Sequence, residues 1–478
     1  MKSKVQIYRD LTTSIILAVL LACSNDSSPH ILGIWQGPHP ENDYATFIFN
    51  IDDQALADSS FKGYWLIRNQ YNSHFSGRIL FYETDSISLD LPEWGCGFAG
   101  KMSADPSRLS GSITCEGEDP DKISLTRVLK RDIYGVFQDS PDPNTPEPLI
   151  SIIPRVNLPA LHDLITAIKQ GQYGEIHSLL IADKDSVYYE SYFKGYGREV
   201  LHPIESANKS ITALLVAMAI HHEVITSDEL LVKDLIPEPY RGVIPDEHPL
   251  RLSDVLGMTA GYAPDDWALL MAEDRELWAL SREPTSSPGV EWNYDGGCPV
   301  ILGLVIRSVT GMPLDQYAEE TLFKELGIRD YDWDLFRQKG NPLPSGSLWL
   351  KPIDLLKIGQ LVLGDGAYQG AQIIDQDLIQ KYTSPLVATG IDNDFYGYQW
   401  WVSEFGKGER HHRMIWANGL GSQFILIFPD DELVIVTTGA NQSGGNDADS
   451  WTIIKGIQEL LLRGEELKED PPENARIY

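Results

Sequence analysis

Short apolar runs alternate with turn-forming residues over the first part of the chain, which is the pattern of β-strands joined by tight connections. Gly, Pro, Asn and Asp-Asp signals separate these runs at spacings typical of an all-β domain. The clearest strand-like runs are residues 46–51, 64–68, 77–82, 86–91 and 109–114. The pattern predicts a small all-β domain, a sandwich or a barrel, over residues 31–130.

A proline-rich stretch follows the predicted β domain. Four prolines fall within residues 139–148. Because proline fixes φ and has no backbone N–H, such a stretch forms neither a helix nor a central strand. We therefore expect a stiff, extended linker over residues 131–153.

Beyond the linker, the apolar positions follow helical spacing or form hairpin pairs. The expected elements are helices over residues 158–169, 206–224 and 451–462, and β-hairpins over residues 177–193 and 423–438. Strands at both ends with helices between them predict an α/β (α+β) domain over residues 154–463. Its antiparallel sheet would mix the first and last hairpins, with helices on its faces and a separate helical region. An acidic tail over residues 464–478 would follow.

The chain opens with an export-type segment. Lys2, Lys4 and Arg9 precede an apolar run over residues 11–22. This run is shorter than the roughly 20 residues that cross a bilayer, and it is typical of a signal peptide, here over residues 1–23.

The end of that segment, Leu20-Leu21-Ala22-Cys23, resembles a bacterial lipobox. The resemblance implies that Cys23 is acylated and starts the mature chain, followed by a short tether over residues 24–30. The alternative is a plain signal peptide with an incidental cysteine. We expect an exported protein, periplasmic or on the cell surface, held to a bacterial membrane by lipid.

The three other cysteines indicate structure rather than metal binding. Cys96 and Cys115 lie in one small region and would be able to form a disulfide in an exported protein. Cys298 precedes an apolar run, which predicts a buried, unreactive thiol. No CxxC or His/Cys cluster suggests a metal site, so we expect no metal or cofactor.

Composition and charge exclude several classes of protein. With 42% hydrophobic and 22% charged residues the chain has an ordinary globular composition. Lys and Arg number 38 and Asp and Glu number 69, which gives a net charge of −31. Such an acidic protein repels phosphate backbones, so nucleic acid is not an expected partner. Membrane contact is expected only through the lipid, and the sequence leaves the oligomeric state open.

Ser206-Ala-Asn-Lys209 is an S-x-x-K motif at the start of the predicted buried helix. Positions i and i+3 share one face of a helix, so Lys209 would reach the Ser206 hydroxyl. The helix N-terminus also favours a developing oxyanion. The same spacing at Ser59–Lys62 and Ser191–Lys194 falls in a loop and at a strand end. The alternative is an N-capping serine with a solvated lysine.

Two further segments carry candidate chemistry. Tyr294 lies in a polar turn just before an apolar, helix-like run, and residues 416–423 form a glycine-rich approach to a strand. Taken alone, each has a structural alternative: a packing tyrosine and a tight turn.

With these motifs in this order, the chain resembles the serine β-lactamase and penicillin-binding-protein superfamily, over about residues 174–462. The closer resemblance is to its esterase-like branch, which includes class C-like serine hydrolases and 6-aminohexanoate-dimer hydrolases. It is carried by residues 176–181, 205–212, 252–261, 292–294, 352–359 and 417–423.

The resemblance implies an acyl-enzyme mechanism. Ser206 would attack an ester or amide carbonyl, and either the amine of Lys209 or the phenolate of Tyr294 would accept its proton. The backbone N–H groups of Ser206 and Leu420 would form the oxyanion hole. We also expect substrate contacts from Asn418, Gly419, Gly421 and Trp400.

Two departures from the family pattern bear on the substrate. Gly296 stands where the tyrosine motif usually has Asn, and Ala417 stands where the strand motif usually has Lys or His. That cation binds the carboxylate of a β-lactam or of a peptide C-terminus. We therefore expect a small-molecule ester or amide, neutral or differently charged, as the substrate.

Two alternatives remain at this stage. One is a β-lactamase or DD-peptidase acting on penicillins or peptidoglycan. The other is an inactive, surface-anchored binding protein whose β domain performs the recognition.

Overall fold

The computed structural model describes the strands of the first part of the chain and most of the chain after residue 155. It describes residues 15–17, 33–37, 45–51, 59–67, 71–82, 86–91, 96–102, 108–115, 121–127, 156–333, 337–392, 394–407, 410–441 and 451–466. Two compact units, Met1–Asp139 and Ser140–Tyr478, make up the chain. The boundary between them falls within the predicted linker, whose residues lie outside the described ones.

The first unit is an antiparallel meander that closes on itself. Its strands are β1 (Ile15–Leu17), β2 (Gly33–Gly37), β3 (Ala45–Ile51), β4 (Ser60–Ile67), β5 (Tyr71–Tyr82), β6 (Ser86–Leu91), β7 (Cys96–Met102), β8 (Arg108–Cys115) and β9 (Asp121–Arg127). Each strand pairs with the next, and β2 also pairs with β9 through Trp35 and Arg127. This closure is the pairing pattern of an up-and-down barrel, one of the two predicted alternatives.

Strand β1 lies inside the predicted signal segment, of which the structure describes no other residue. It pairs with β2, but the ring from β2 to β9 closes without it. The predicted removal of residues 1–22 would therefore leave that ring intact.

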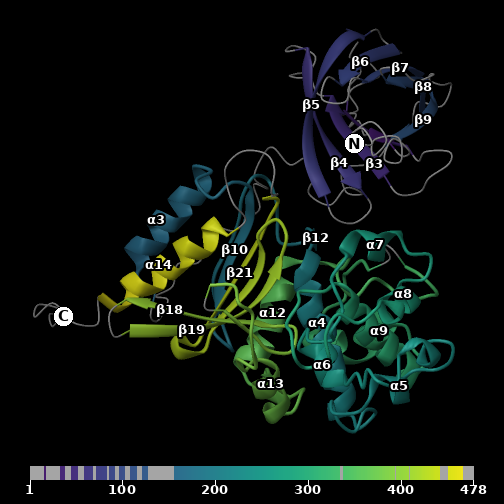
Figure 1. Ribbon diagram of the computed structural model, residues 1–478. Coiled ribbons are helices and arrows are strands. Elements are labelled where there is room, and N and C mark those ends of the chain that lie inside the picture. The colour runs from purple at the N-terminus through teal and green to yellow at the C-terminus, as the bar shows by residue number, and fades with distance from the viewer. Residues whose placement is uncertain are drawn as a thin grey trace, which may run out of the picture. The chain divides into compact units, whose positions relative to one another are not determined.

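The second unit is built on an eight-stranded sheet (Figure 1). Its order is β11-β10-β21-β20-β19-β18-β17-β16, and all neighbours are antiparallel. The strands are β10 (Ile176–Ala182), β11 (Val187–Tyr192), β16 (Val387–Ala388), β17 (Phe395–Tyr396), β18 (Trp401–Lys407), β19 (Arg410–Gly419), β20 (Gln423–Phe428) and β21 (Leu433–Gly439). The predicted mixing of the first and last hairpins is confirmed, because β10 lies between β11 and β21.

Helices cover both faces of this sheet, as the predicted fold class requires. Helices α3 (Leu158–Lys169) and α14 (Thr452–Glu466) lie side by side on one face, and α12 (Pro352–Leu363) packs against β20 and β21 on the other (Figure 1). Helix α14 continues into the first residues of the predicted acidic tail. The rest of that tail lies outside the described residues.

Local sequence explains where α3 begins and how it is held. The side chain of Asn157 accepts the N–H of Ala160 at 3.0 Å, and a proline occupies the first turn. The amide of Asn157 also donates to the carbonyl of Arg463 in α14, and the Arg463 guanidinium pairs with Asp163 at 3.0 Å. The predicted bounds of this helix are confirmed.

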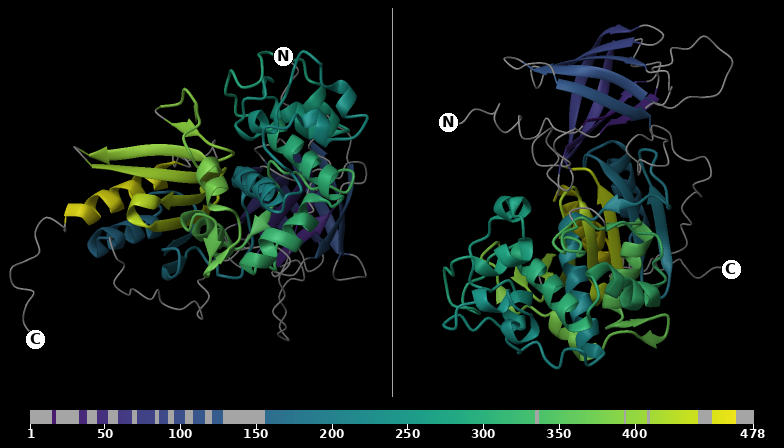
Figure 2. Two further views of the ribbon diagram at one scale, coloured as in Figure 1. Left: turned by 90° about the horizontal axis from the view of Figure 1, so that it is seen from below. Right: turned by 90° about the vertical axis from the view of Figure 1, so that its right-hand side faces the viewer.

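The remaining helices form a region beside the sheet, seen from two further directions in Figure 2. They are α4 (Asn208–His221), α5 (Val232–Leu235), α6 (Leu252–Leu256), α7 (Asp266–Met271), α8 (Arg275–Ser281), α9 (Gly297–Thr310), α10 (Leu314–Ala318), α11 (Lys324–Leu326) and α13 (Gln376–Tyr382). Short turns of other helix types are η3 (Glu205–Ala207), η4 (Arg241–Val243), η5 (Glu319–Phe323) and η6 (Pro429–Asp431). Two small ladders pair β12 (His202–Pro203) with β13 (Trp349–Leu350) and β14 (Ala367–Tyr368) with β15 (Ala371–Gln372).

Helix α9 is the centre of that region and packs against α4, α6 and α8. Its first ten residues are buried, including Cys298, so the predicted burial of this thiol is confirmed. Burial raises the pKa of the Cys298 thiol further above its ordinary value.

Among the described residues, no single helix has both the length and the apolar character to cross a membrane. One pair, Gly297–Thr310 with Leu314–Leu326, meets the criterion jointly by length and composition, but it bends by 73°.

A buried hydroxyl pair joins the first and last strands of the sheet core. The Ser178 and Thr438 hydroxyls lie 2.7 Å apart across β10 and β21, and both residues are 0% exposed. We predict that Ser178→Ala destabilises the protein by about 1–3 kcal/mol, because it leaves the Thr438 hydroxyl buried without a partner.

The matched variant Ser178→Ala/Thr438→Val removes both hydroxyls, so its cost should be smaller than the sum of the two single changes. Denaturant unfolding of the three variants measures the coupling. Strictly additive losses would contradict the interaction.

Candidate active site

Ser206 lies in η3, the short turn between β12 and helix α4. The turn is held in place from outside, because β12 pairs with β13 and the N–H of Ile204 donates to the carbonyl of Leu348 at 2.9 Å. The predicted helix over 206–224 therefore begins with a tighter turn, and α4 itself starts at Asn208. Ser206 precedes the first residue of a buried helix, as the motif suggests.

Lys209 reaches back to Ser206 from the first turn of α4. Its Nζ donates to Ser206 Oγ at 2.7 Å and to the carbonyl oxygen of Ser345 at 3.0 Å. The residue is only 4% exposed. The i, i+3 spacing thus brings the two side chains within hydrogen-bond distance in a nearly dry environment.

The carbonyl groups of segment 341–348 hold the start of α4. Asn208 donates to the carbonyl of Gly346 at 2.7 Å, and Thr212 donates to that of Pro344 at 3.0 Å. This segment is not among the site residues predicted from the sequence. The signal for it is the presence of an amide and a hydroxyl side chain, Asn208 and Thr212, among the buried residues of this helix, since buried polar groups need partners.

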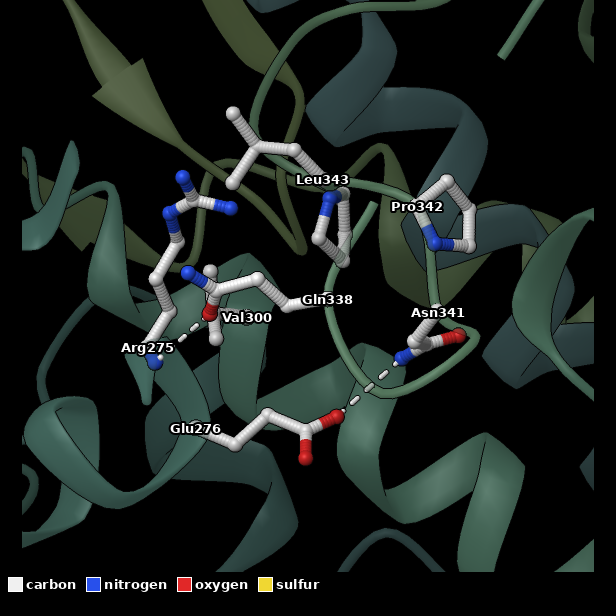
Figure 3. Close-up of a pocket in the computed structure, with 8 residues that line it drawn as sticks. Arg275, Glu276, Val300, Gln338, Asn341, Pro342 and Leu343 are labelled. Carbon is white, nitrogen blue, oxygen red and sulfur yellow. Dashed lines mark hydrogen bonds between the residues drawn. The ribbon is translucent and has the colours of Figure 1, made fainter. Parts of the chain in front are cut away.

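The same segment also lines a pocket (Figure 3). Its walls include Arg275 and Glu276 of α8, Gln338, and the segment from Asn341 to Pro344. Two hydrogen bonds fix the wall: Gln338 Oε1 accepts the N–H of Arg275 at 3.1 Å, and Asn341 donates to Glu276 at 3.3 Å. The segment that supplies the Ser345 carbonyl is thus anchored to the helical region by these two contacts.

Tyr294 lies beside Lys209, just before α9. The Lys209 Nζ lies 4.9 Å from the centroid of the tyrosine ring. The next residue, Asp295, accepts two hydrogen bonds from Arg282, at 2.9 and 2.7 Å, and these two side chains are only 3% and 10% exposed. Asp295 also accepts the N–H of Gly297 at 3.0 Å. This buried ion pair, which the sequence analysis missed, fixes the turn that carries Tyr294.

Aromatic rings surround Tyr294. Its ring centroid lies 5.7 Å from Trp401, 6.3 Å from Trp292 and 6.4 Å from Tyr396. Tyr396 is buried, and its burial raises the pKa of its hydroxyl well above the ordinary value. One side of the candidate site is therefore a wall of aromatic rings.

The end of β19 packs directly against the serine turn. A Cβ at Gly419 would overlap the carbonyl oxygen of Ile204, so only glycine fits there. This contact places the backbone of Leu420, the predicted oxyanion donor, beside η3. Gly421 is buried with a φ of 87°, and Asn418 and Leu420 are partly buried.

Side chains outside the motif hold the turn after Gly419. Asn441 donates to the Ser422 hydroxyl at 3.0 Å and to the carbonyl of Tyr173 at 2.7 Å. Gln423 donates to the carbonyls of Gly421 and Gly439. The turn is thus anchored to β21 and to the approach to β10.

Other predicted site residues fall elsewhere. Trp400 is 0% exposed, so in this structure its ring offers no surface to a substrate. Cys23 lies outside the described residues. Cys96 and Cys115 are directly opposite each other in the β7–β8 register, but their side chains lie outside the described ones. In the described part of the chain, no group of three or more His, Cys, Asp or Glu could hold a metal ion.

Glu205, next to Ser206, is an unusual carboxyl group. It is partly buried and has a φ of 51°, in the left-handed region that non-glycine residues rarely adopt. Burial raises its pKa from the ordinary 4.5 to about 8, although the charge of Lys209 acts in the opposite direction. Between these pH values the folded protein holds a proton that the unfolded chain has released.

We predict that Glu205→Gln stabilises the protein near pH 8 and changes its stability little near pH 4.5. Wild type loses stability as pH rises through this window, by up to about 1.4 kcal/mol per pH unit, because folding opposes ionisation of the carboxyl. Denaturant unfolding at several pH values measures the difference. Glu223→Gln is the matched control, since Glu223 also has a positive φ but is exposed. A difference that is constant with pH would contradict the prediction.

The family model for Beta-lactamase matches residues 172–455, more than half of the chain. A curated relative from Salmonella paratyphi A, named "Putative D-alanyl-D-alanine carboxypeptidase", is 27% identical over 184 residues. The match covers 33% of this chain and 43% of the relative, so the chain spans less than half of that relative's length.

Solved structures share the fold of the second unit. The "Putative 6-aminohexanoate-dimer hydrolase from Bacillus anthracis" is similar with a TM-score of 0.52 at 18% identity, over 64% of this chain and 83% of that one. The octameric penicillin-binding protein homologue from Pyrococcus abyssi is similar with a TM-score of 0.51 at 17% identity, over 66% of this chain and 78% of that one. At 17–18% sequence identity, these two similarities establish only that the second unit shares their fold. On the match of the family model over most of its second unit, the chain belongs to the β-lactamase family of serine hydrolases.

Proposed function

We propose that this serine hydrolase cleaves ester or amide bonds of small molecules through an acyl-enzyme on Ser206. The observation that carries the proposal is the 2.7 Å hydrogen bond between Lys209 Nζ and Ser206 Oγ at the start of a buried helix. A candidate base must lie within hydrogen-bond distance of the proton it removes, and Lys209 meets that condition.

In the proposed reaction, Ser206 Oγ attacks the carbonyl carbon while its proton passes to Lys209. The oxyanion accepts hydrogen bonds from the N–H groups of Ser206 and Leu420, and loss of one such donor costs about 3 kcal/mol. Tyr294, whose ring lies 4.9 Å from Lys209 Nζ, protonates the leaving group. In the second half of the reaction the Tyr294 phenolate takes a proton from water as that water attacks the acyl-enzyme, and Lys209 returns its proton to Ser206 Oγ.

The structure around the site supports a preference for substrates other than β-lactams. Ala417 of β19 is buried and carries no charge, and Gly296 has no side chain to hold a substrate amide. A carboxylate-bearing substrate would lack a charge-assisted hydrogen bond worth about 1.5–3 kcal/mol. The name of the curated relatives favours a second candidate, a D-alanyl-D-alanine carboxypeptidase. Penicillin labelling of Ser206 would support that candidate.

We predict that a fluorophosphonate probe labels full-length protein at Ser206 and that Ser206→Ala abolishes the labelling. Hydrolysis of p-nitrophenyl acetate and butyrate should fall on the order of a thousandfold in this variant. Mass spectrometry of the labelled peptide and initial rates test both points.

Ser191→Ala is the matched control, because Ser191 and Lys194 have the same S-x-x-K spacing outside the site. It should keep both labelling and rate. Equal rates in wild type and Ser206→Ala, without labelling, would contradict the proposal and favour the inactive binding protein.

We propose that the protein is exported and anchored to a bacterial membrane through lipid on Cys23. The supporting observation is the charged start and apolar run that end at Leu20-Leu21-Ala22-Cys23. In a bacterial host fed with radioactive palmitate, wild type should incorporate label into the membrane fraction. Cys23→Ser should not, whereas Cys298→Ser, which alters a buried thiol, should label normally. Equal labelling of wild type and Cys23→Ser would exclude the anchor.

A further inference from the structure

At Gly296, where the family pattern has an asparagine, another side chain occupies the space beside the backbone. A Cβ at Gly296 would overlap Oδ1 of Asp266, the first residue of α7. The Gly296 N–H donates to that oxygen at 3.2 Å. An exposed carboxylate from a separate helix therefore fills the space where the family pattern has a neutral amide.

Asp266 contacts the turn that carries Tyr294. Gly296 follows Tyr294 by two residues, and the Tyr294 ring lies 4.9 Å from the Lys209 Nζ. One hydrogen bond from a backbone N–H uses only part of the acceptor capacity of a carboxylate, so Asp266 can still accept from a ligand. Its exposure leaves it open to a molecule that approaches the site.

The two cations beside the tyrosine turn, Arg282 and Lys209, already donate to other groups. Arg282 lies against Gly297, but its guanidinium is bound to Asp295 by two hydrogen bonds and is nearly buried. Lys209 donates to Ser206 and Ser345. At Ala417 the chain has no cation to offset the negative charge. Among the described residues Asp266 forms no ion pair, so its charge is available to attract a positive group on a substrate.

We propose that Asp266 is a specificity-determining residue that selects substrates with an ammonium group near the scissile ester or amide bond. This inference rests on the proposed function of Ser206. The Asp266 carboxylate attracts such an ammonium group and repels a carboxylate at the same position. The preferred substrates are therefore amine-bearing esters or amides.

The test uses two ester series and full-length protein. In the first series, p-nitrophenyl esters carry an acyl chain of equal length that ends in ammonium, methyl or carboxylate. In the second, butyrate esters carry these three groups on the alcohol. In at least one series, kcat/KM for the ammonium ester should exceed that for the carboxylate ester by about tenfold or more. Equal values in both series would overturn the proposal.

Asp266→Asn keeps an acceptor for the Gly296 N–H but removes the charge, so it should reduce this ratio at least about threefold. Asp266→Lys should invert the preference. The matched control is Asp265→Asn. Asp265 is also exposed, but it caps α7 by accepting the N–H of Ala268 at 2.9 Å, and asparagine caps as well. An equal fall of the ratio in Asp265→Asn would assign the effect to general surface charge and overturn the proposal.

A binding measurement separates failure of the inference from failure of the proposed function. Ser206→Ala is titrated by calorimetry with 6-aminohexanamide and with the amide that carries a carboxylate in place of the amine. Tighter binding of the amine, lost in Ser206→Ala/Asp266→Asn, supports the inference even if wild type hydrolyses no ester. Ester hydrolysis that depends on Ser206 but shows no charge preference would leave the function standing and remove the role of Asp266.

Discussion

Helix α4 is buried along most of its length, and a buried helix tolerates polar side chains only where other groups satisfy them. Asn208, Lys209 and Thr212 all meet this requirement through backbone carbonyls of segment 341–348. The need to satisfy these buried polar side chains has two consequences. It fixes the helix against a loop more than 130 residues away in sequence, and it holds the lysine amine at the serine hydroxyl. The remaining parts of the candidate site are arranged around this fixed start of α4.

Two close contacts complete the arrangement. Gly419 brings the end of β19 against the carbonyl that precedes the serine turn, which ties the sheet to α4. The buried Arg282–Asp295 pair fixes the tyrosine turn from the helical region. A buried ion pair contributes little net stability, but loss of one partner leaves an uncompensated charge and is costly. The pair therefore serves mainly to hold Tyr294 in place, and it contributes little to the stability of the fold.

Much of the second unit could be predicted from sequence, because its signals are local. Helix α3 has its cap at Asn157 and its apolar stripe within twelve residues, and both hairpins carry their own turns. The S-x-x-K spacing likewise encodes the approach of Lys209 to Ser206. For contacts between distant segments, the sequence indicates at most that a buried polar group needs a partner, not which segment supplies it. The Ser345 carbonyl, the partner of Asp295 and the carboxylate over Gly296 come from loops and short helices whose positions depend on the whole fold. The closure of β2 on β9 is not predictable from sequence for the same reason, since no local pattern distinguishes a barrel from a sandwich.

The pairing of β10 with β21 also constrains the order in which the protein can form during synthesis. Ser178 and Thr438 are 260 residues apart, so at ribosomal speed roughly 13–50 s separate the two strands. During that interval the inner edge of β10 has no partner, and an unpaired apolar strand invites association with other chains. The first unit differs, because most of its strands pair with their immediate successors and can do so as they emerge. The nascent chain therefore needs protection chiefly while its second half is being made, and a truncated product lacking the last strands would keep an open sheet edge.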